Sequence, residues 1–277
     1  MARKKLEKTY GFKLTDGQLT RYDKIYIIGA GGNGSYLIPN IARFISTLNT
    51  GRKCQLIIVD GDTVEDKNLI RQNFVSADVG KNKAEVLAQR YSGAFGVEIG
   101  HIPSYMSTWR DVQVERDALV ITCTDNLKSR KIIADSCKNN VWIDLGNEAT
   151  HGQVSFSYTG IRTWDGTIYN NSRFQIPNVF ELFPDHLEKL SEEIRKESIR
   201  VSCAELAEES PQQLGFINNT CAAVAMNYVH ALLTQRPILT YMTFVSIDNT
   251  FEQRFITESI IKEWSKKIER MKGSITL

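Results

Sequence analysis

The sequence lacks the long apolar segments that mark membrane proteins. No apolar run approaches the roughly 20 residues that a helix needs to cross a bilayer, and the first residues, MARKKLEK, are basic and polar. A secretory signal peptide requires an apolar stretch behind its basic start, and this sequence shows none there. We therefore expect a cytoplasmic protein without a membrane partner.

Cysteine is scarce, and its spacing excludes the common zinc motifs. The 277 residues include five cysteines, an odd number with no CxxC pair. Structural zinc sites use closely spaced cysteines and histidines, and the four histidines show no such spacing. We expect free thiols in a reducing compartment.

An excess of charge of one sign is also absent. Lysine and arginine number 34 and aspartate and glutamate 32, so the formal net charge is +2. Because a nucleic-acid-binding surface usually shows as a strong basic excess, the composition argues against nucleic acid as a partner.

What the sequence does contain is a glycine-rich turn between an apolar run and a helical pattern. The run Ile25–Ile28 leads into GAGGNG, and a helical pattern follows to about Leu48. Gly29 permits a tight turn, Gly31 lets the backbone approach a phosphate, and Gly34 lets the helix pack on the strand. The helix N-terminus offers free N–H groups and a partial positive charge to an anion. The pattern predicts a nucleotide site; a tight strand–helix turn without a ligand is the alternative.

Strands and helices alternate after this turn. Further strands are predicted at 55–60, 97–102, 118–123 and 141–145. This alternation is typical of a Rossmann-like, doubly wound α/β fold with a mostly parallel sheet, in which ligands bind outside the carboxyl ends of strands. Gly29, Asp60 and Asp125 each follow a strand, so we expect them at one crevice, where Asp60 can accept hydrogen bonds from ribose hydroxyls.

The last part of the chain departs from the alternation. The elements predicted there are a surface helix over the site at 185–200, a strong helix at 216–233, a closing strand pair at 241–247 and 252–256, and a charged helix at 260–271. We divide the chain into a lead-in (1–21), a nucleotide-binding domain (22–158) and a C-terminal antiparallel and helical extension of the same fold (159–277).

Six motifs occur together and in order: GxGGxG, DGDxVExxNLxRQ, DxGxxKA, CTDNxxxR, WIDxG and GQV. Over roughly Tyr22–Tyr158 the chain resembles the ThiF/MoeB/HesA family, the bacterial relatives of ubiquitin-activating enzymes. A weaker similarity at 201–206 (VSCAEL) and 216–218 (FIN) resembles the PRTRC-type ThiF subset.

The resemblance implies an activity. Members of this family bind ATP and Mg²⁺, adenylate the C-terminal carboxylate of a small ubiquitin-like (β-grasp, ThiS-like) protein or a peptide, and release pyrophosphate. Many then pass the acyl group to a cysteine. The resemblance also implies a homodimer in which an arginine comes from the partner subunit; Arg21 and Arg43 are the candidates in this sequence.

The resemblance also assigns residues. Those expected to bind the nucleotide are Gly29, Gly31, Gly32, Gly34, Asp60, Asn68, Arg71, Gln72, Lys83, Asp125 and Asn126. Among them, Asp60 matches the ribose-binding acid, Lys83 the phosphate lysine and Asp125 the magnesium ligand, and Arg130 completes the last motif.

Three of these residues suit the chemistry of adenylation and are the expected catalytic set. Attack on the α-phosphate builds negative charge, which Arg71 can clamp with a planar guanidinium and Lys83 can meet as a point charge. Asp125 can hold Mg²⁺. Each has a simpler alternative: a surface ion pair for Arg71, a solvated helix position for Lys83, and a helix N-cap for Asp125.

One cysteine differs from the rest. Cys123, Cys137 and Cys221 lie in apolar patterns and are expected to be packed side chains. Cys203 follows Ser202 in SCAE, a capping-box signature, so it would open a helix whose dipole favours a thiolate. We expect Cys203 as a candidate acyl-accepting nucleophile, with a structural cysteine as the alternative.

Two other functions remain open from the sequence. A nicotinamide-dependent oxidoreductase could use the same glycine turn, although nothing near it supplies an acid or base for hydride transfer. A non-catalytic scaffold could keep nucleotide binding alone.

Overall fold

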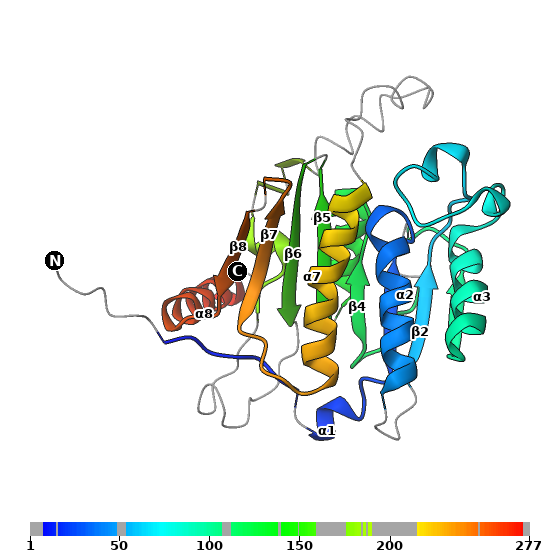
Figure 1. Cartoon of the computed structure of the whole chain (residues 1–277). Coiled ribbons are helices and arrows are strands. Elements are labelled where there is room, and N and C mark those ends of the chain that lie inside the picture. The colour runs from blue at the N-terminus through cyan, green and yellow to red at the C-terminus, as the bar shows by residue number, and fades with distance from the viewer. Residues whose placement is uncertain are drawn as a thin grey trace.

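The structure is built on one sheet with the spatial order β3-β2-β1-β4-β5-β6-β7-β8 (Figure 1). The computed structural model describes residues 8–14, 16–48, 54–106, 112–137, 140–148, 150–158, 176–183, 185–186, 188–189, 215–248 and 250–273, with the backbone alone at 17–18 and 267–273. The strands are β1 (Lys24–Ile28), β2 (Gln55–Val59), β3 (Ile99–Ile102), β4 (Leu119–Thr122), β5 (Val141–Asn147), β6 (His151–Tyr158), β7 (Thr240–Ser246) and β8 (Phe251–Phe255).

The sheet has a parallel part and an antiparallel part. Strands β3, β2, β1, β4 and β5 run parallel to their neighbours, and β6, β7 and β8 extend the same sheet in antiparallel pairs. This confirms the predicted fold class, a mostly parallel Rossmann-like sheet with an antiparallel extension.

Helices cover both faces of the sheet. They are α1 (Asp16–Leu19), α2 (Gly32–Thr47), the 3-10 turns η1 (Asp66–Asn68) and η2 (Ser76–Asp78), α3 (Lys83–Phe95), α4 (Leu127–Ser136), α5 (Val179–Leu182), α7 (Gly215–Leu233) and α8 (Glu258–Gly273). Figure 1 shows α2, α3 and α7 side by side on one face. Among the described residues, no helix is both long and apolar enough to span a bilayer.

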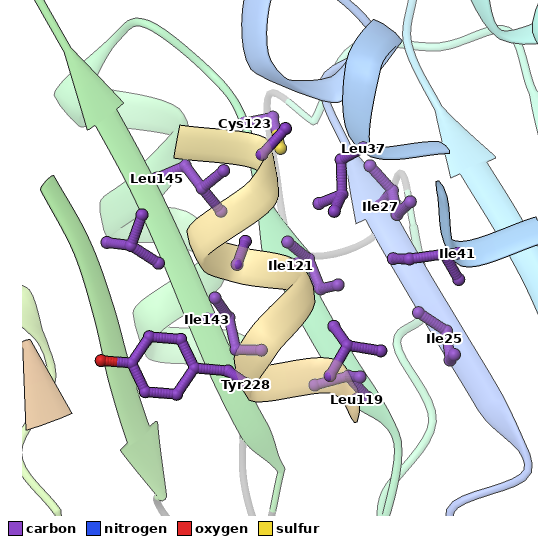
Figure 2. Packing of buried hydrophobic residues seen from close by; sticks show 14 of the residues in the cluster. Ile25, Ile27, Leu37, Ile41, Leu119, Ile121, Cys123, Ile143, Leu145 and Tyr228 are labelled. Atoms are coloured by element: carbon purple, nitrogen blue, oxygen red, sulfur yellow. The ribbon is translucent and has the colours of Figure 1, made fainter. Parts of the chain in front are cut away.

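The central strands β1 and β4 are mostly apolar because both of their faces are buried. In β1, Ile25 and Ile27 pack with the side chains of α2 and α7 (Figure 2). The alternate residues Tyr26 and Ile28 belong to the cluster on the opposite face, which includes Ile133 of α4. Alternation of side chains along a strand sends neighbours to opposite faces, so a short unbroken apolar run marks a strand between two helical layers.

The order of the strands places the nucleotide turn. The chain runs outward from β1 to β2 and β3, then returns to the other side of β1 as β4. The loops that follow β1 and β4 therefore diverge at the carboxyl edge of the sheet, and ligands of doubly wound sheets bind at this switch point. Gly29 follows β1 and Asp125 follows β4.

The helix after the glycine turn contains a proline without being interrupted. Pro39 lies inside α2 and has no N–H to donate to the carbonyl of Ser35. That carbonyl accepts instead from Nδ2 of Asn73 at 3.2 Å, and the backbone N–H of Asn73 donates to Oγ of Ser35 at 2.9 Å. The proline thus leaves the carbonyl of Ser35 available as an acceptor, and the hydrogen bond from Asn73 to this carbonyl connects α2 with the loop between β2 and α3.

Candidate active site

The first and last glycines of the turn are required by backbone geometry. Gly29 has a φ of +97°, and a Cβ there would lie 2.8 Å from the carbonyl group of Cys123. A Cβ on Gly34 would lie 2.0 Å from the carbonyl oxygen of Gly29. The tight turn and the close helix packing that the sequence predicted for these two positions are both observed.

The two middle glycines differ from each other. A Cβ on Gly31 would have one neighbour within 4 Å, Nε2 of Gln72 at 3.7 Å, so this backbone stays open to the cavity. A Cβ on Gly32 would lie 2.8 Å from Nδ2 and 2.9 Å from Oδ1 of Asn218. Gly32 therefore has a packing reason that the motif alone did not reveal.

The acid at the end of β2 joins two strand ends. Oδ2 of Asp60 accepts from the N–H of Ala30 at 2.6 Å, and Oδ1 accepts from the N–H of Asp62 at 2.8 Å. Burial raises the pKa of Asp60, while these two backbone N–H groups oppose that rise. Each carboxylate oxygen has a second lone pair, so both can still accept from a ribose hydroxyl.

The phosphate lysine is held by a neighbouring aspartate. Lys83 is only 5% exposed, and its Nζ lies 2.9 Å from Oδ2 of Asp62. Oδ1 of Asp62 accepts from the hydroxyl of Tyr105 at 2.7 Å. Burial opposes ionisation of Asp62, but the hydrogen bonds from Tyr105 and Lys83 outweigh it and lower the pKa of Asp62. The alternative of a solvated Lys83 is wrong. The roles of Asp62 and Tyr105 were not predicted from the sequence.

Tyr105 forms the rim of the cavity beside Gly61. Its ring would lie 2.7 Å from a Cβ on Gly61, so only glycine lets the ring reach this position. The hydrogen bond to Asp62, followed by burial, raises the pKa of Tyr105 to about 12. The phenol is therefore protonated and donating at neutral pH.

The loop after Asp60 presents Arg71 on a turn built by its own residues. Oδ1 of Asn68 accepts from the N–H of Glu65 at 2.9 Å, and its carbonyl accepts from the N–H groups of Arg71 and Gln72 at 3.2 and 2.9 Å. Within the described part of the chain, no ion pair or hydrogen bond engages the guanidinium of Arg71, so the surface ion pair considered for it is not observed.

The side chain of Arg130 holds the loop after β4 in place. Its Nη2 donates to the carbonyls of Thr124 at 2.9 Å and Leu145 at 2.8 Å, and its Nε lies 3.6 Å from Oδ1 of Asp144. A Cβ on Gly146 would lie 3.0 Å from this guanidinium, which explains the glycine of the WIDxG motif. Arg130 thus joins the carboxyl ends of β4 and β5.

Asp125 lies in the same loop and lines the cavity. The N-cap of α4 is Asn126, whose Oδ1 accepts from the N–H of Ser129 at 2.8 Å; the alternative that made Asp125 the cap is wrong. Asp125 is exposed, and no described group forms an ion pair with its carboxylate. The described residues contain no cluster of three or more metal-ligating side chains.

The predicted residues meet at one cavity of about 850 Å³ at the carboxyl edge of the sheet. Those that line it are Gly29, Gly31, Gly32, Asp60, Asn68, Arg71, Gln72, Lys83, Asp125 and Asn126. Gly34 acts through helix packing behind the wall. Arg71 and Asp125, which are far apart in the sequence, thus line the same space.

Further residues reach the cavity from segments where the sequence pattern was weak. His151, at the start of β6, lines it, as do His186 and Lys189, which belong to the helix predicted over the site at 185–200. Most of that predicted helix lies outside the described residues. Burial, then the charges of Lys189 and Arg130, lower the pKa of His186.

Three of the described cysteines are too deeply buried for covalent chemistry. Cys123, Cys137 and Cys221 are buried, as expected, and none of them is part of a disulfide bond. Burial raises the pKa of Cys137 and of Cys221 to about 12, and it raises the pKa of Cys123 further. Thiols with such pKa values carry almost no thiolate at neutral pH. Cys203 lies outside the described residues.

The fold and the cavity together define a class of protein. A glycine turn, a helix N-terminus and a basic cluster at the switch point of a doubly wound sheet are the parts of a nucleotide-binding site. The sequence profile of the ThiF family matches residues 11–266, and the chain belongs to the ThiF family.

Similar proteins are known from sequence and from structure. The chain is 27% identical over 158 residues to "Ubiquitin-like modifier-activating enzyme 5" of Oryza sativa subsp. japonica, a match of 49% of this chain and 35% of that protein. It is 34% identical over 119 residues to "Adenylyltransferase and sulfurtransferase MOCS3-1" of Zea mays, a match of 41% of this chain and 23% of that protein. The crystal structure of E. coli MccB with ATP has 18% identity and a TM-score of 0.58, and the match covers 87% of this chain and 66% of that one. The matched segments thus span about a third or less of the two plant proteins.

Proposed function

We propose that this protein adenylates a carboxylate at the expense of ATP, and that the carboxylate is the C-terminus of a small ubiquitin-like, ThiS-like protein or a peptide. The observation that carries the proposal is the convergence of Arg71, Lys83 and Asp125 on one cavity at the N-terminus of α2. Membership of the ThiF family and the names of the plant relatives support the same class of reaction.

The cavity offers a place for each part of ATP. The N-terminus of α2 and the open backbone at Gly31 suit the phosphates, and Asp60 can accept hydrogen bonds from the ribose. Arg71 can bind phosphate oxygens in a bidentate manner because no described group pairs with its guanidinium. Lys83 points a charge into the same space while Asp62 keeps it in place.

Asp125 fits a nucleotide-bound magnesium ion. Mg²⁺ in nucleotide sites is commonly held by one or two carboxylates together with phosphate oxygens and water, and Asp125 offers a single exposed carboxylate on the cavity wall. When bound, Mg²⁺ supplies charge neutralisation on the phosphate oxygens. The residues present therefore fit the ion without any further protein ligand.

The reaction needs positioning and electrostatics more than proton transfer. An oxygen of the substrate carboxylate forms a bond to the α-phosphorus of ATP, the bond from that phosphorus to the bridging oxygen breaks, and pyrophosphate leaves with the electron pair. The attacking carboxylate is already ionised at neutral pH, so no general base is required. Arg71 and Lys83 stabilise the charge that builds on the phosphates.

Two further parts of the proposal follow from the resemblance. Cys203 would accept the acyl group as a thioester after adenylation. A homodimer would bring Arg21 or Arg43 of the partner subunit to the site. Analytical ultracentrifugation that shows only monomer at assay concentration would remove the second part.

Exchange of radiolabelled pyrophosphate into ATP, with candidate partner proteins or peptides present, tests the reaction. Asp125→Ala should abolish exchange and leave the fold intact, whereas Asp135→Ala, a matched exposed aspartate on α4, should retain it. Exchange that survives in Asp125→Ala would refute the role of Asp125. In the same assay Cys203→Ala should keep exchange and lose a thiol-labile adduct; a persisting adduct would place the acceptor elsewhere.

The rival functions give different outcomes. A nicotinamide-dependent oxidoreductase would be stabilised against heat by NAD and not by ATP–Mg²⁺. A non-catalytic scaffold would bind ATP tightly and show no exchange with any partner.

A further inference from the structure

Three asparagine side chains form a chain of hydrogen bonds at the cavity: Asn33 and Asn147 line it, and Asn218 is buried next to them. Nδ2 of Asn33 donates to Oδ1 of Asn147 at 2.8 Å, Nδ2 of Asn147 donates to Oδ1 of Asn218 at 2.5 Å, and Nδ2 of Asn218 donates to the carbonyl of Arg71 at 3.2 Å. These residues come from the start of α2, the end of β5, the first turn of α7 and the loop after β2. We call the three side chains the amide relay.

The direction of the relay is set at its Arg71 end. A carbonyl can only accept, so Asn218 must turn its NH₂ group towards Arg71 and its oxygen towards Asn147. The same requirement passes along to Asn33, whose Oδ1 is left buried with no partner among the described residues. The hydrogen bond from Asn218 to the carbonyl of Arg71 is therefore present, whereas Oδ1 of Asn33 has no described partner.

The relay connects the two groups that we expect to hold the phosphates. The guanidinium of Arg71 engages no described partner, so its place depends on the backbone that carries it. That backbone is held at its N–H by Asn68 and at its carbonyl by Asn218. The other end of the relay, Asn33, lies in the first turn of α2, which would bind the phosphates.

Gly32 belongs to the same arrangement. Asn218 is fully buried, and its amide fills the space where a Cβ of Gly32 would lie, 2.8 Å from Nδ2. Any larger residue at position 32 must displace this amide. The third glycine of GAGGNG is therefore explained by a side chain of α7 rather than by a phosphate.

We propose that Asn218 is a positioning residue of the nucleotide site, which through the amide relay sets Arg71 relative to the N-terminus of α2. The proposal rests on the proposed function, because it assigns Arg71 and α2 to ATP. If the proposal is correct, the nucleotide site depends on the first turn of α7. The contact between Gly32 and Asn218 can then be altered by mutation of Asn218, without a change in the nucleotide.

A double-mutant cycle tests the pairing of Gly32 with Asn218. Asn218→Ala should lower pyrophosphate exchange and ATP–Mg²⁺ affinity by roughly five- to tenfold, the size of one lost hydrogen bond. Gly32→Ala alone should also lower them, but the double variant should be no worse than Asn218→Ala, because the added methyl group then meets no amide. If the losses of the two single variants multiply in the double variant, Gly32 contributes to phosphate binding independently of Asn218, and the proposed pairing of these two residues is refuted.

The matched control is Asn219→Ala, an exposed asparagine next to Asn218 on the same helix, which should behave as wild type. Hydrogen–deuterium exchange of peptides covering residues 66–74 should be faster in Asn218→Ala than in this control. Unchanged protection of that loop together with unchanged ATP affinity would overturn the proposal. These two measurements need no partner protein, so they remain decisive if pyrophosphate exchange, and with it the proposed function, fails.

A second variant separates positioning from folding. In Asn218→Asp the ionised carboxylate can accept from Asn147 but cannot donate to the carbonyl of Arg71. ATP–Mg²⁺ affinity relative to wild type should therefore be low at pH 8 and recover as the pH falls and the buried carboxyl becomes protonated, because burial raises the pKa of such a group. A pH-independent loss would indicate a merely structural role for Asn218.

Discussion

The two walls of the cavity handle charge in opposite ways. On the wall after β2, Asp60 accepts from two backbone N–H groups, and Lys83 and Asp62 form an ion pair. On the wall after β4, Arg130 uses its guanidinium to join two strand ends, and Asp125 above it engages no described partner. On the first wall Asp60, Asp62 and Lys83 have partners. On the second wall no described group forms an ion pair with the carboxylate of Asp125.

This difference separates residues that stabilise the structure of the site from residues whose charge is available to bind a ligand. A paired, buried charge serves stability and ligand binding together, because removing it leaves its partner unsatisfied. An exposed, unpaired charge adds little to stability and keeps its full capacity for a ligand. Arg71 is the exception on the first wall, since its guanidinium has no described partner. The comparison thus predicts which substitutions affect catalysis alone.

Arg71→Ala should have the largest effect. Pyrophosphate exchange should fall by about a hundredfold or more, because two charge-assisted hydrogen bonds are each worth roughly 1.5–3 kcal/mol. The free energy of unfolding, measured with urea, should change by less than about 0.5 kcal/mol, as for other surface sites. Arg90→Ala is the matched control, an arginine of α3 that does not line the cavity: Arg90 pairs with the buried Asp78, so its loss should lower stability more than Arg71→Ala does. Equal stability losses in the two variants would contradict the comparison.

Lys83→Met should lower pyrophosphate exchange less than Arg71→Ala does, and it should also lower stability. Exchange should fall by roughly tenfold, the loss expected from one charge-assisted hydrogen bond, and the free energy of unfolding should also fall because Asp62 loses its partner. Adding Asp62→Asn in the same chain should restore part of the stability and none of the exchange. Urea unfolding and exchange assays on the three proteins check this. If Lys83→Met leaves stability untouched, the ion pair does not contribute to the folded state.

The smallest effect concerns pH. Hydrogen bonds from Tyr105 and Lys83 lower the pKa of Asp62 in the folded state. A group whose pKa is lower when folded stabilises the protein above its unfolded pKa, about 3.9 for aspartate, and this contribution is lost as the pH falls through the folded value. The unfolding free energy of wild type should therefore drop more between pH 6 and pH 3 than that of Asp62→Asn. Equal drops in the two proteins would show that Asp62 has no part in acid sensitivity.

Much of the fold was predictable because its determinants are local. Apolar runs such as Ile25–Ile28 indicated the parallel strands, and the predicted bounds of these strands agree with the structure to within about two residues. The positive φ of Gly29 and the close approach of Gly34 to the carbonyl oxygen of Gly29 both lie within the turn itself. The segment around Cys203 falls outside the described residues, so its predicted helix start stays a prediction.

The partners of the site residues were not predictable in the same way. Asp62 and Tyr105 are separated by 43 residues and Arg71 and Asn218 by 147, and nothing in the motif around any of them specifies the other. Gly32 was expected among the nucleotide-binding residues from the resemblance, yet the atoms nearest to its missing side chain belong to Asn218 of α7.

By itself, the sequence determined the order of strands and helices, the glycine turn and the kinds of charge at each strand end, because steric and hydrophobic rules act over a few residues. Only the tertiary structure decided which charges are paired and which stay free. That choice depends on distances between segments far apart in the chain, and these distances are set when the helices and the sheet pack together.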